Sequence, residues 1–198
     1  MPDAVDLFGG AGGATLALER CGYRTASYDV WEPAVAAHHA NLLRAIGRDL
    51  ISNPLSQKDT GPVDLLWASP PCQPFSAAGK GQGELDERDG MRATVASIAQ
   101  VRPSRFIIEN VANLAGTSHR RYLEVILDGL RGAGYAVEHH VIDAADYGVP
   151  QHRRRLIVQG CRDGGAITWP DPTHGPGVKR PHVTVRDEAA VPTVLDFG

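Results

Sequence analysis

The sequence predicts an α/β fold, with a mainly parallel sheet that ends in a late antiparallel pair of strands. Short apolar runs alternate with segments of helix length, which is the pattern of βαβ units. The last two apolar runs follow one another, and we expect them to form the antiparallel pair. At 198 residues, the chain is long enough to bury one such core without disulfides or metals.

Three strands and two helices are expected before residue 69. The predicted strands are Ala4–Phe8, Arg24–Val30 and Val63–Ala68. The first strand ends at a cluster of glycines, and residues 14–21 are predicted to form a helix. The second helix begins at Pro33, which suits a helix N-terminus, and runs to about Ile46.

The second half continues the alternation and then changes character. A loop rich in proline and glycine runs from Ser69 to about Gly90. The elements predicted after it are the helices Thr94–Val101 and Arg120–Gly132 and the strands Arg105–Glu109, Ala136–Ile142 and Arg155–Gln159. From Trp169 onward, prolines break any period. We therefore expect one domain over residues 1–165, followed by a tail over residues 166–198 that follows the surface or acts as a linker.

Composition excludes several classes of protein. No stretch approaches the ~20 apolar residues that span a bilayer, and the acidic N-terminus does not resemble a signal peptide. A cytoplasmic location is therefore expected. The three cysteines, Cys21, Cys72 and Cys161, show no CxxC spacing, which argues against a disulfide scaffold and a structural zinc site. No metal is expected.

The charge of the chain is low, but its arginines are clustered. A net charge of −3 and a pI of about 6.2 provide no global attraction to a polyanion. Two local basic clusters stand out, at His119–Arg121 and His152–Arg155. Arginine binds phosphates and base edges in a planar, bidentate geometry. A locally basic groove on a mildly acidic protein is compatible with DNA binding.

A glycine-rich turn follows the first predicted strand. Glycine permits positive φ and lets backbone N–H groups approach a ligand closely. Thr15 stands where the dinucleotide fingerprint GxGxxG needs its last glycine, which weakens an NAD interpretation. Asp29 ends the second strand, where α/β nucleotide folds place a carboxylate against ribose hydroxyls. These features favour a nucleoside cofactor, and the alternative is a tight turn beside a solvated acid.

Two chemically reactive groups are expected at one edge of the sheet. Cys72 follows the third predicted strand, and Glu109 with Asn110 stands at the end of the next one; ligands bind outside the carboxyl ends of parallel strands. A loop position allows partial exposure and a lowered thiol pKa for Cys72, and Glu109 suits acid/base work. The alternatives are a buried structural cysteine and a carboxylate capped by backbone donors. For Cys21 and Cys161 we expect the buried structural role.

Four ordered motifs resemble those of the DNA (cytosine-5) methyltransferase family. They are Asp6-Leu7-Phe8 with Gly10, Gly12 and Gly13; Pro71-Cys72-Gln73 with Phe75-Ser76; Glu109-Asn110-Val111; and Gln151-His152-Arg153-Arg154-Arg155. The resemblance extends to about residue 190. It implies the Rossmann-like fold of S-adenosylmethionine-dependent methyltransferases, with S-adenosyl-L-methionine as cofactor and cytosine-containing DNA as substrate.

The resemblance also implies which residues bind cofactor and substrate. The implied cofactor-binding residues are Asp6, Phe8, Gly10, Gly12, Gly13, Asp29, Val30, Asp49, Leu50 and Pro71. Asp29 stands where the family usually has a glutamate on the ribose hydroxyls, and Asp49 where the partner of the adenine amino group is expected. The implied substrate-binding residues are Gln73, Ser76, Asn110 and Gln151.

The implied reaction is methyl transfer to carbon 5 of cytosine. The Cys72 thiolate adds to carbon 6 of a flipped-out base, Glu109 holds N3 and the exocyclic amine, and Arg155, with Arg153 nearby, contacts O2. No metal is required. The loop from Gly79 to Gly90 is interpreted as a lid over the base, with a plain solvated loop as the alternative.

The tail from Trp169 to Asp187 resembles the segment that precedes the target-recognition domain in the family. Relatives continue with that domain and two late motifs, so three explanations stay open: a half-enzyme completed by a second polypeptide, a truncated copy, or a minimal form. A tRNA cytosine-5 methyltransferase and an inactive relic that only binds cofactor or DNA are rival functions. The expected setting is a bacterial or phage-encoded DNA-methylation enzyme, as in restriction-modification, acting at the nucleoid.

Overall fold

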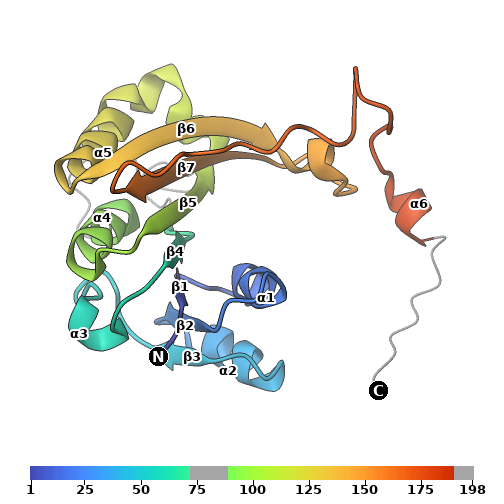
Figure 1. The fold of residues 1–198 in the computed structure, drawn as a ribbon. Helices are drawn as coiled ribbons and strands as arrows, with labels where there is room; N and C mark the ends of the chain where they lie inside the picture. Colours follow the sequence, from blue (N-terminus) through green and yellow to red (C-terminus); the bar gives the residue numbers. More distant parts are fainter. Residues whose placement is uncertain (72–88, 190–198) are drawn as a thin grey trace.

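A twisted sheet runs through the molecule, with helices on both of its sides (Figure 1). The computed structural model describes residues 1–71 and 89–189. Within these ranges, the sheet has seven strands in the order β3-β2-β1-β4-β5-β7-β6. Their bounds are Ala4–Leu7 (β1), Thr25–Asp29 (β2), Ala45–Gly47 (β3), Leu65–Ala68 (β4), Arg105–Val111 (β5), Tyr135–Asp143 (β6) and Arg154–Arg162 (β7).

The sheet is parallel up to β5 and then changes direction. The strands β3, β2, β1, β4 and β5 pair in parallel, whereas β7 runs antiparallel to both of its neighbours, β5 and β6. This arrangement confirms the predicted fold class, including the late antiparallel pair. The central strand β1 is buried along its whole length, which explains why its sequence is a nearly unbroken apolar run.

Helices of different lengths connect the strands. The α-helices are Gly13–Arg20 (α1), Glu32–Ala40 (α2), Gln57–Thr60 (α3), Gly90–Val101 (α4), Arg120–Gly132 (α5) and Val185–Ala189 (α6). Short 3₁₀ turns occupy Ala112–Ala115 (η3), Thr117–His119 (η4) and Ala144–Tyr147 (η5). Among the described helices, none is long and apolar enough to cross a membrane.

The main core lies between the sheet and the helices α4 and α5. Val5 and Leu7 of β1 belong to the same apolar cluster as Ile98 of α4 and Leu127 of α5. Helix α5 presents a continuous apolar stripe to this cluster, made of Tyr122, Leu123, Ile126, Leu127 and Leu130. A smaller cluster on the opposite face packs Leu18 of α1 against Ala4 and Leu65. The two layers hold β1 and β4 rigidly, so the carboxyl ends of these strands form a fixed edge.

The predicted helix from Pro33 to about Ile46 is wrong in its second half. Helix α2 ends at Ala40, and Ala45–Gly47 forms the edge strand β3, which pairs in parallel with β2. Leu42 explains the break, because its φ of 58° lies in the left-handed region and turns the chain out of the helix. The residue before it, Asn41, bonds its side-chain amide back to the carbonyl of Ala37 and closes the last turn.

Two smaller expectations also change. Cys21 is exposed rather than buried, because it caps the C-terminus of α1, where the chain turns toward solvent; Cys161 is buried as expected. Strand β5 continues to Val111, so Glu109 and Asn110 lie inside the strand, where successive side chains point to opposite faces.

The segment from residue 166 to 184 carries no helix or strand and follows strand β6 and the turn η5. Trp169 stacks on His140, with ring centroids 4.1 Å apart, and donates a hydrogen bond to Glu138. Further along, His182 bonds to Asp146 of η5. The tail is thus fastened to the antiparallel end of the sheet (Figure 1).

Candidate active site

A pocket of about 540 Å³ opens at the carboxyl ends of the parallel strands. It is lined by Phe8, Asp29, Val30, Trp31, Arg48, Asp49, Leu50, Ile51, Ser69 and Pro71. Six of the predicted cofactor-binding residues are therefore brought together in one place: Phe8, Asp29, Val30, Asp49, Leu50 and Pro71. This location is the one expected for a ligand of an open parallel sheet.

The glycine-rich turn after β1 is tied to the end of β2. Gly10 and Gly12 have φ values of 52° and 93°, which favour glycine. The amide of Gly10 donates to Oδ2 of Asp29 (3.0 Å), and the amide of Trp31 donates to Oδ1 (2.8 Å). Gly13, by contrast, begins α1 in open space, where an added Cβ meets nothing. Asp29 thus joins the glycine turn, through Gly10, to the start of α2, through Trp31, while it lines the pocket.

Asp6 lies beneath the glycine turn and is fully buried. Its Oδ2 accepts a hydrogen bond from the hydroxyl of Thr15 (2.6 Å), which also lies 3.1 Å from Nε2 of His38. Among the described residues, none hydrogen-bonds Oδ1. Burial raises the pKa of Asp6 to about 6. A Cβ added at Gly9 would come within 3.1 Å of Oδ2, so the turn closes directly over this carboxyl group.

Asp49 is held by the turn that it begins. Its Oδ1 accepts hydrogen bonds from the amides of Ile51 (3.0 Å) and Ser52 (3.2 Å). Hydrogen bonds from Ser52 lower the pKa of this carboxyl group, so it is ionised at neutral pH. The next residue, Leu50, is almost fully buried and supplies an apolar wall. An ionised acceptor beside an apolar wall suits a purine with an amino group.

The second part of the site lies on β5 and β7. Arg155 donates from Nε to Oε1 of Glu109 over 2.6 Å, and Nη2 of Arg153 lies 3.7 Å from the same oxygen. The antiparallel register allows this contact. It places Arg155 opposite Val111, and Glu109 lies two positions from Val111 on the same face of the strand. The side chains of Glu109 and Arg155 are 22% and 24% exposed, so solvent screens their attraction only in part. Three predicted catalytic residues are thus brought together.

Asn110 points to the face opposite Glu109 and joins β5 to the segment that precedes Cys72. Its side-chain amide donates to the carbonyl of Pro70 (3.2 Å) and lies 3.5 Å from the sulfur of Met91. Its side-chain oxygen accepts from the amide of Val111 (2.8 Å). The side chain of the buried Asn110 therefore makes its hydrogen bonds to other residues of the chain, although it was predicted to bind substrate.

Other predicted residues are less constrained or undescribed. Gln151 is exposed, and its backbone amide donates to the carbonyl of Val149 in the turn before β7. Cys72, Gln73 and Ser76 lie outside the described residues.

Most of the predicted lid also lies outside the described residues, but its last part is visible. Asp89 caps α4, because its carboxylate accepts from the amides of Met91 (3.0 Å) and Arg92 (3.2 Å) and from the hydroxyl of Tyr122 (2.5 Å). The contact with Tyr122 also joins α4 to α5. Asp89 is thus a buried helix cap rather than a solvated loop residue.

The sequence reasoning missed four residues that line the pocket, namely Trp31, Arg48, Ile51 and Ser69. Trp31 could have been found, since an aromatic residue two positions after the acid that ends a strand is well placed to cover a nucleoside. Its side chain is 63% exposed, which is unusual for tryptophan. Arg48 carried no recognisable signal, because its partners lie on a turn and on the short helix α3, neither of which was predicted.

The turn before β7 holds the basic cluster in place. Asp143 accepts from the ring of His152 (3.0 Å) and from the amide of Arg153 (2.8 Å). The hydrogen bond from His152 lowers the pKa of Asp143 to about 2.

Within residues 1–71 and 89–189, no group of three His, Cys, Asp or Glu side chains is placed to hold a metal ion.

Comparison with known proteins gives one consistent family. The C-5 cytosine-specific DNA methylase family matches residues 3–188. The Type II methyltransferase M.AplI of Arthrospira platensis is 36% identical over 174 residues, which cover 84% of this chain and 47% of that protein. The Type II methyltransferase M.AquIA of Picosynechococcus sp. is 34% identical over 201 residues, which cover 87% of this chain and 77% of that protein.

Solved structures support the fold independently. A putative DNA modification methyltransferase encoded within an Escherichia coli prophage has a TM-score of 0.72 at 22% identity, with 94% of this chain and 54% of that chain covered. Spodoptera frugiperda DNMT2 has a TM-score of 0.64 at 23% identity, with 84% and 51% covered. The chain spans about half the length of most of the curated relatives it matches. The fold, the ordered motifs and the match over residues 3–188 place the chain in the C-5 cytosine-specific DNA methylase family.

Proposed function

We propose that this chain transfers a methyl group from S-adenosyl-L-methionine to carbon 5 of cytosine in DNA, through a covalent adduct of Cys72 with a flipped-out base. One observation carries the proposal. Glu109 is held by Arg155, while its neighbour Asn110 bonds to Pro70, two residues before Cys72. The strand that holds the carboxylate is thereby joined to the segment that leads to the thiol.

The pocket fits the adenosine part of the proposed cofactor. Asp49 offers an ionised acceptor for the adenine amino group, and Asp29, which also lines the pocket, offers a carboxylate for the ribose hydroxyls. Phe8, Trp31 and Leu50 supply aromatic and apolar surface for the purine ring. Beneath the glycine turn, Oδ1 of Asp6 is buried without a partner among the described residues, and a carboxylate oxygen of this kind suits a cationic group such as an ammonium.

Bound at this edge, the cofactor supplies a sulfonium-activated methyl group. The residues of the chain must then activate carbon 5, which is a poor nucleophile in cytosine. Arg155 orients Glu109 through a hydrogen bond of 2.6 Å, and a carboxylate accepts a hydrogen bond from the exocyclic amine of the base. Its negative charge also favours protonation of N3, which makes carbon 6 more electrophilic toward the thiolate of Cys72.

The covalent cycle then closes without a net change in the enzyme. A bond forms between the sulfur of Cys72 and carbon 6. Carbon 5 then takes the methyl group, the bond from that methyl to the cofactor sulfur breaks to leave a neutral thioether, and a base removes the proton from carbon 5. Elimination of the thiolate restores the aromatic ring. Because this chemistry needs both faces of the ring, the base must leave the stack, at a cost of a few kcal/mol.

The proposal is tested by transfer of a labelled methyl group to duplex DNA and to tRNA, side by side. Label in DNA that is absent with Cys72→Ser supports it. Label found only in tRNA would show that tRNA, and not DNA, is the substrate. Equal transfer by Cys72→Ser would overturn the mechanism. A restriction-modification setting is proposed on the names of the curated relatives, which are Type II methyltransferases.

A further inference from the structure

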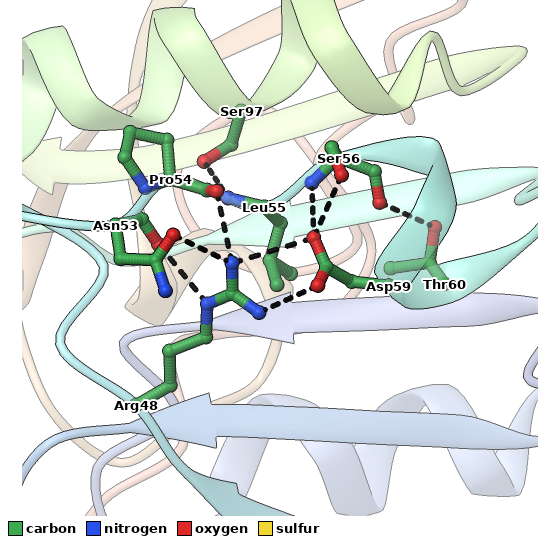
Figure 2. Close-up of polar contacts among 8 residues, drawn as sticks. All are labelled: Arg48, Asn53, Pro54, Leu55, Ser56, Asp59, Thr60 and Ser97. Carbon is green, nitrogen blue, oxygen red and sulfur yellow. Dashed lines mark hydrogen bonds and ion pairs between the residues drawn. The ribbon is translucent and has the colours of Figure 1, made fainter.

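Arg48 makes a dense set of hydrogen bonds at the rim of the pocket. It follows β3, precedes Asp49 and lines the pocket. From its guanidinium, Nε donates to the carbonyl of Asn53 (3.0 Å), and Nη2 donates to the side-chain oxygen of Asn53 (3.0 Å) and to the carbonyl of Pro54 (3.1 Å). Nη1 and Nη2 also reach the two carboxylate oxygens of Asp59, at 2.8 Å and 3.3 Å. Figure 2 shows the guanidinium enclosed by these three residues.

The acceptors of Arg48 belong to two different segments. Asn53 and Pro54 lie in the turn after β3, whereas Asp59 lies in α3. Asp59 is itself fixed, because its Oδ2 accepts from the amide and the hydroxyl of Ser56, both at 2.8 Å (Figure 2). The side chain of Arg48 therefore fastens the turn to a helix that is already rigid.

The fastened turn is the one that forms the wall of the pocket. Asp49, Leu50 and Ile51 all line it. The amide of Asn53 donates to the carbonyl of Asp49 (3.0 Å), so Arg48 holds Asn53 and Asn53 holds Asp49. At the other end, the amide of Arg48 donates to the carbonyl of Asp29 (2.9 Å). Arg48 thus connects the backbones of Asp29 and Asp49, the two residues that bring carboxylates to the pocket.

The chemistry of the contact requires arginine. The side chains of Arg48 and Asp59 are 18% and 29% exposed. Hydrogen bonding from Arg48 lowers the pKa of Asp59 to about 2, so the ion pair persists through the neutral range. A lysine carries three donors on one nitrogen atom and cannot span acceptors on both segments in one plane.

We propose that Arg48 is a positioning residue for the cofactor, acting through the turn at residues 49–53, which it holds in the geometry that binds the adenine end. The inference rests on the proposed use of S-adenosylmethionine. Asp49 and Leu50 touch the cofactor, and Arg48 sets where they stand.

The test compares Arg48→Met, Arg48→Lys and Asp59→Asn with the unaltered chain. We expect Arg48→Met to raise the Kd for S-adenosylmethionine about tenfold, the scale of a lost charge-assisted hydrogen bond. Asp59→Asn raises it less, and the double variant Arg48→Met/Asp59→Asn falls short of the product of the single effects. Arg48→Lys lies between Arg48→Met and the unaltered chain. In turnover, KM for the cofactor rises by more than kcat falls.

The matched control is Arg24→Met. Arg24 also makes two hydrogen bonds to one aspartate, from Nε and Nη2 to Asp3 at 2.8 Å and 2.7 Å, but this pair lies in solvent at the amino ends of β1 and β2, away from the pocket. We expect the Kd of the Arg24→Met variant for S-adenosylmethionine to equal that of the unaltered chain. Amide hydrogen exchange at residues 50–53 in the ligand-free protein speeds up in Arg48→Met and not in Arg24→Met.

The outcomes separate the two proposals. If the unaltered chain binds the cofactor and Arg48→Met binds it equally well, with only a lower Tm, Arg48 serves stability alone and the inference is overturned. If the unaltered chain binds no S-adenosylmethionine, the proposed function falls and takes the inference with it. Should Arg48→Met fail to fold, Arg48→Lys and Asp59→Asn decide by the same criterion.

Discussion

The two halves of the proposed site, one for the cofactor and one for the target base, hold their carboxylates in different ways. On the cofactor side, Asp29 and Asp49 accept hydrogen bonds from backbone amides on neighbouring turns. On the base side, Glu109 is held by the side chain of Arg155, which lies 46 residues away on an antiparallel strand. The first half is supported by backbone amides. The second depends on the register of two strands and on two arginine side chains, of which Arg155 makes the hydrogen bond and Arg153 lies 3.7 Å away.

This difference predicts different tolerances to substitution. Backbone donors remain when a nearby side chain changes, so the cofactor side should weaken by degrees. A carboxylate in a partly desolvated place that loses the arginine hydrogen-bonded to it loses its orientation and much of its charge balance, even though Arg153 remains 3.7 Å from Glu109. The base side should therefore fail sharply.

The largest effect is expected on the base side. Arg155→Met should lower kcat for methyl transfer about 10²- to 10³-fold, the scale of removing one preorganised electrostatic partner. The Kd for the cofactor should change less than about twofold, since the pocket lies on other strands. Arg154→Met is the matched control, because Arg154 is the exposed neighbour. Equal losses in the two variants would show that net charge, not the Glu109 contact, matters.

The second effect concerns the buried carboxyl group under the glycine turn. Because burial raises the pKa of Asp6 to about 6, its contribution to stability is present in full below the unfolded pKa of ~3.9 and is lost as pH rises through 6. Asp6→Asn removes this dependence, so its stability relative to the unaltered chain should rise by up to about 3 kcal/mol from pH 4 to pH 8. Urea denaturation at both pH values measures it; parallel pH profiles would contradict the assignment.

A smaller effect is expected at the end of β2. Asp29→Glu keeps the charge but lengthens the side chain by one methylene, which displaces the acceptors of the Gly10 and Trp31 amides. We expect the cofactor Kd to rise about tenfold, with kcat at saturation largely kept. Asp128→Asn, an exposed acid on α5, serves as control. A lower Kd in Asp29→Glu would show instead that the shorter acid limits contact with the ribose.

The smallest effect probes the junction of α4 and α5. Tyr122→Phe removes the hydrogen bond to the Asp89 cap and should cost about 1 kcal/mol of folding free energy. Thermal denaturation would show a lower Tm with the cofactor Kd unchanged. A change in cofactor affinity of the same size as the loss in stability would show that the junction of α4 and α5 is coupled to the pocket.

Much of the site could be predicted because its residues follow strand ends in recognisable motifs. Asp29 and Asp49 line the pocket at the carboxyl edge, where topology and family resemblance predicted them, whereas Glu109 lies two residues before the end of β5. Leu42 shows what could not be predicted, since a leucine in a left-handed conformation leaves no local signal, and β3 was missed for that reason. Arg48 was missed with it, because its contacts depend on a turn that only tertiary packing defines.

The most direct test of the central claim uses duplex DNA that carries 5-fluorocytosine. Fluorine at carbon 5 blocks the final elimination, so attack by Cys72 leaves the protein bonded to the DNA. The account predicts a denaturation-resistant adduct that depends on S-adenosylmethionine, is lost in Cys72→Ser and is retained in Cys21→Ser, which alters an exposed cysteine elsewhere. Absence of the adduct at concentrations where the cofactor is bound, or its persistence in Cys72→Ser, would contradict the account.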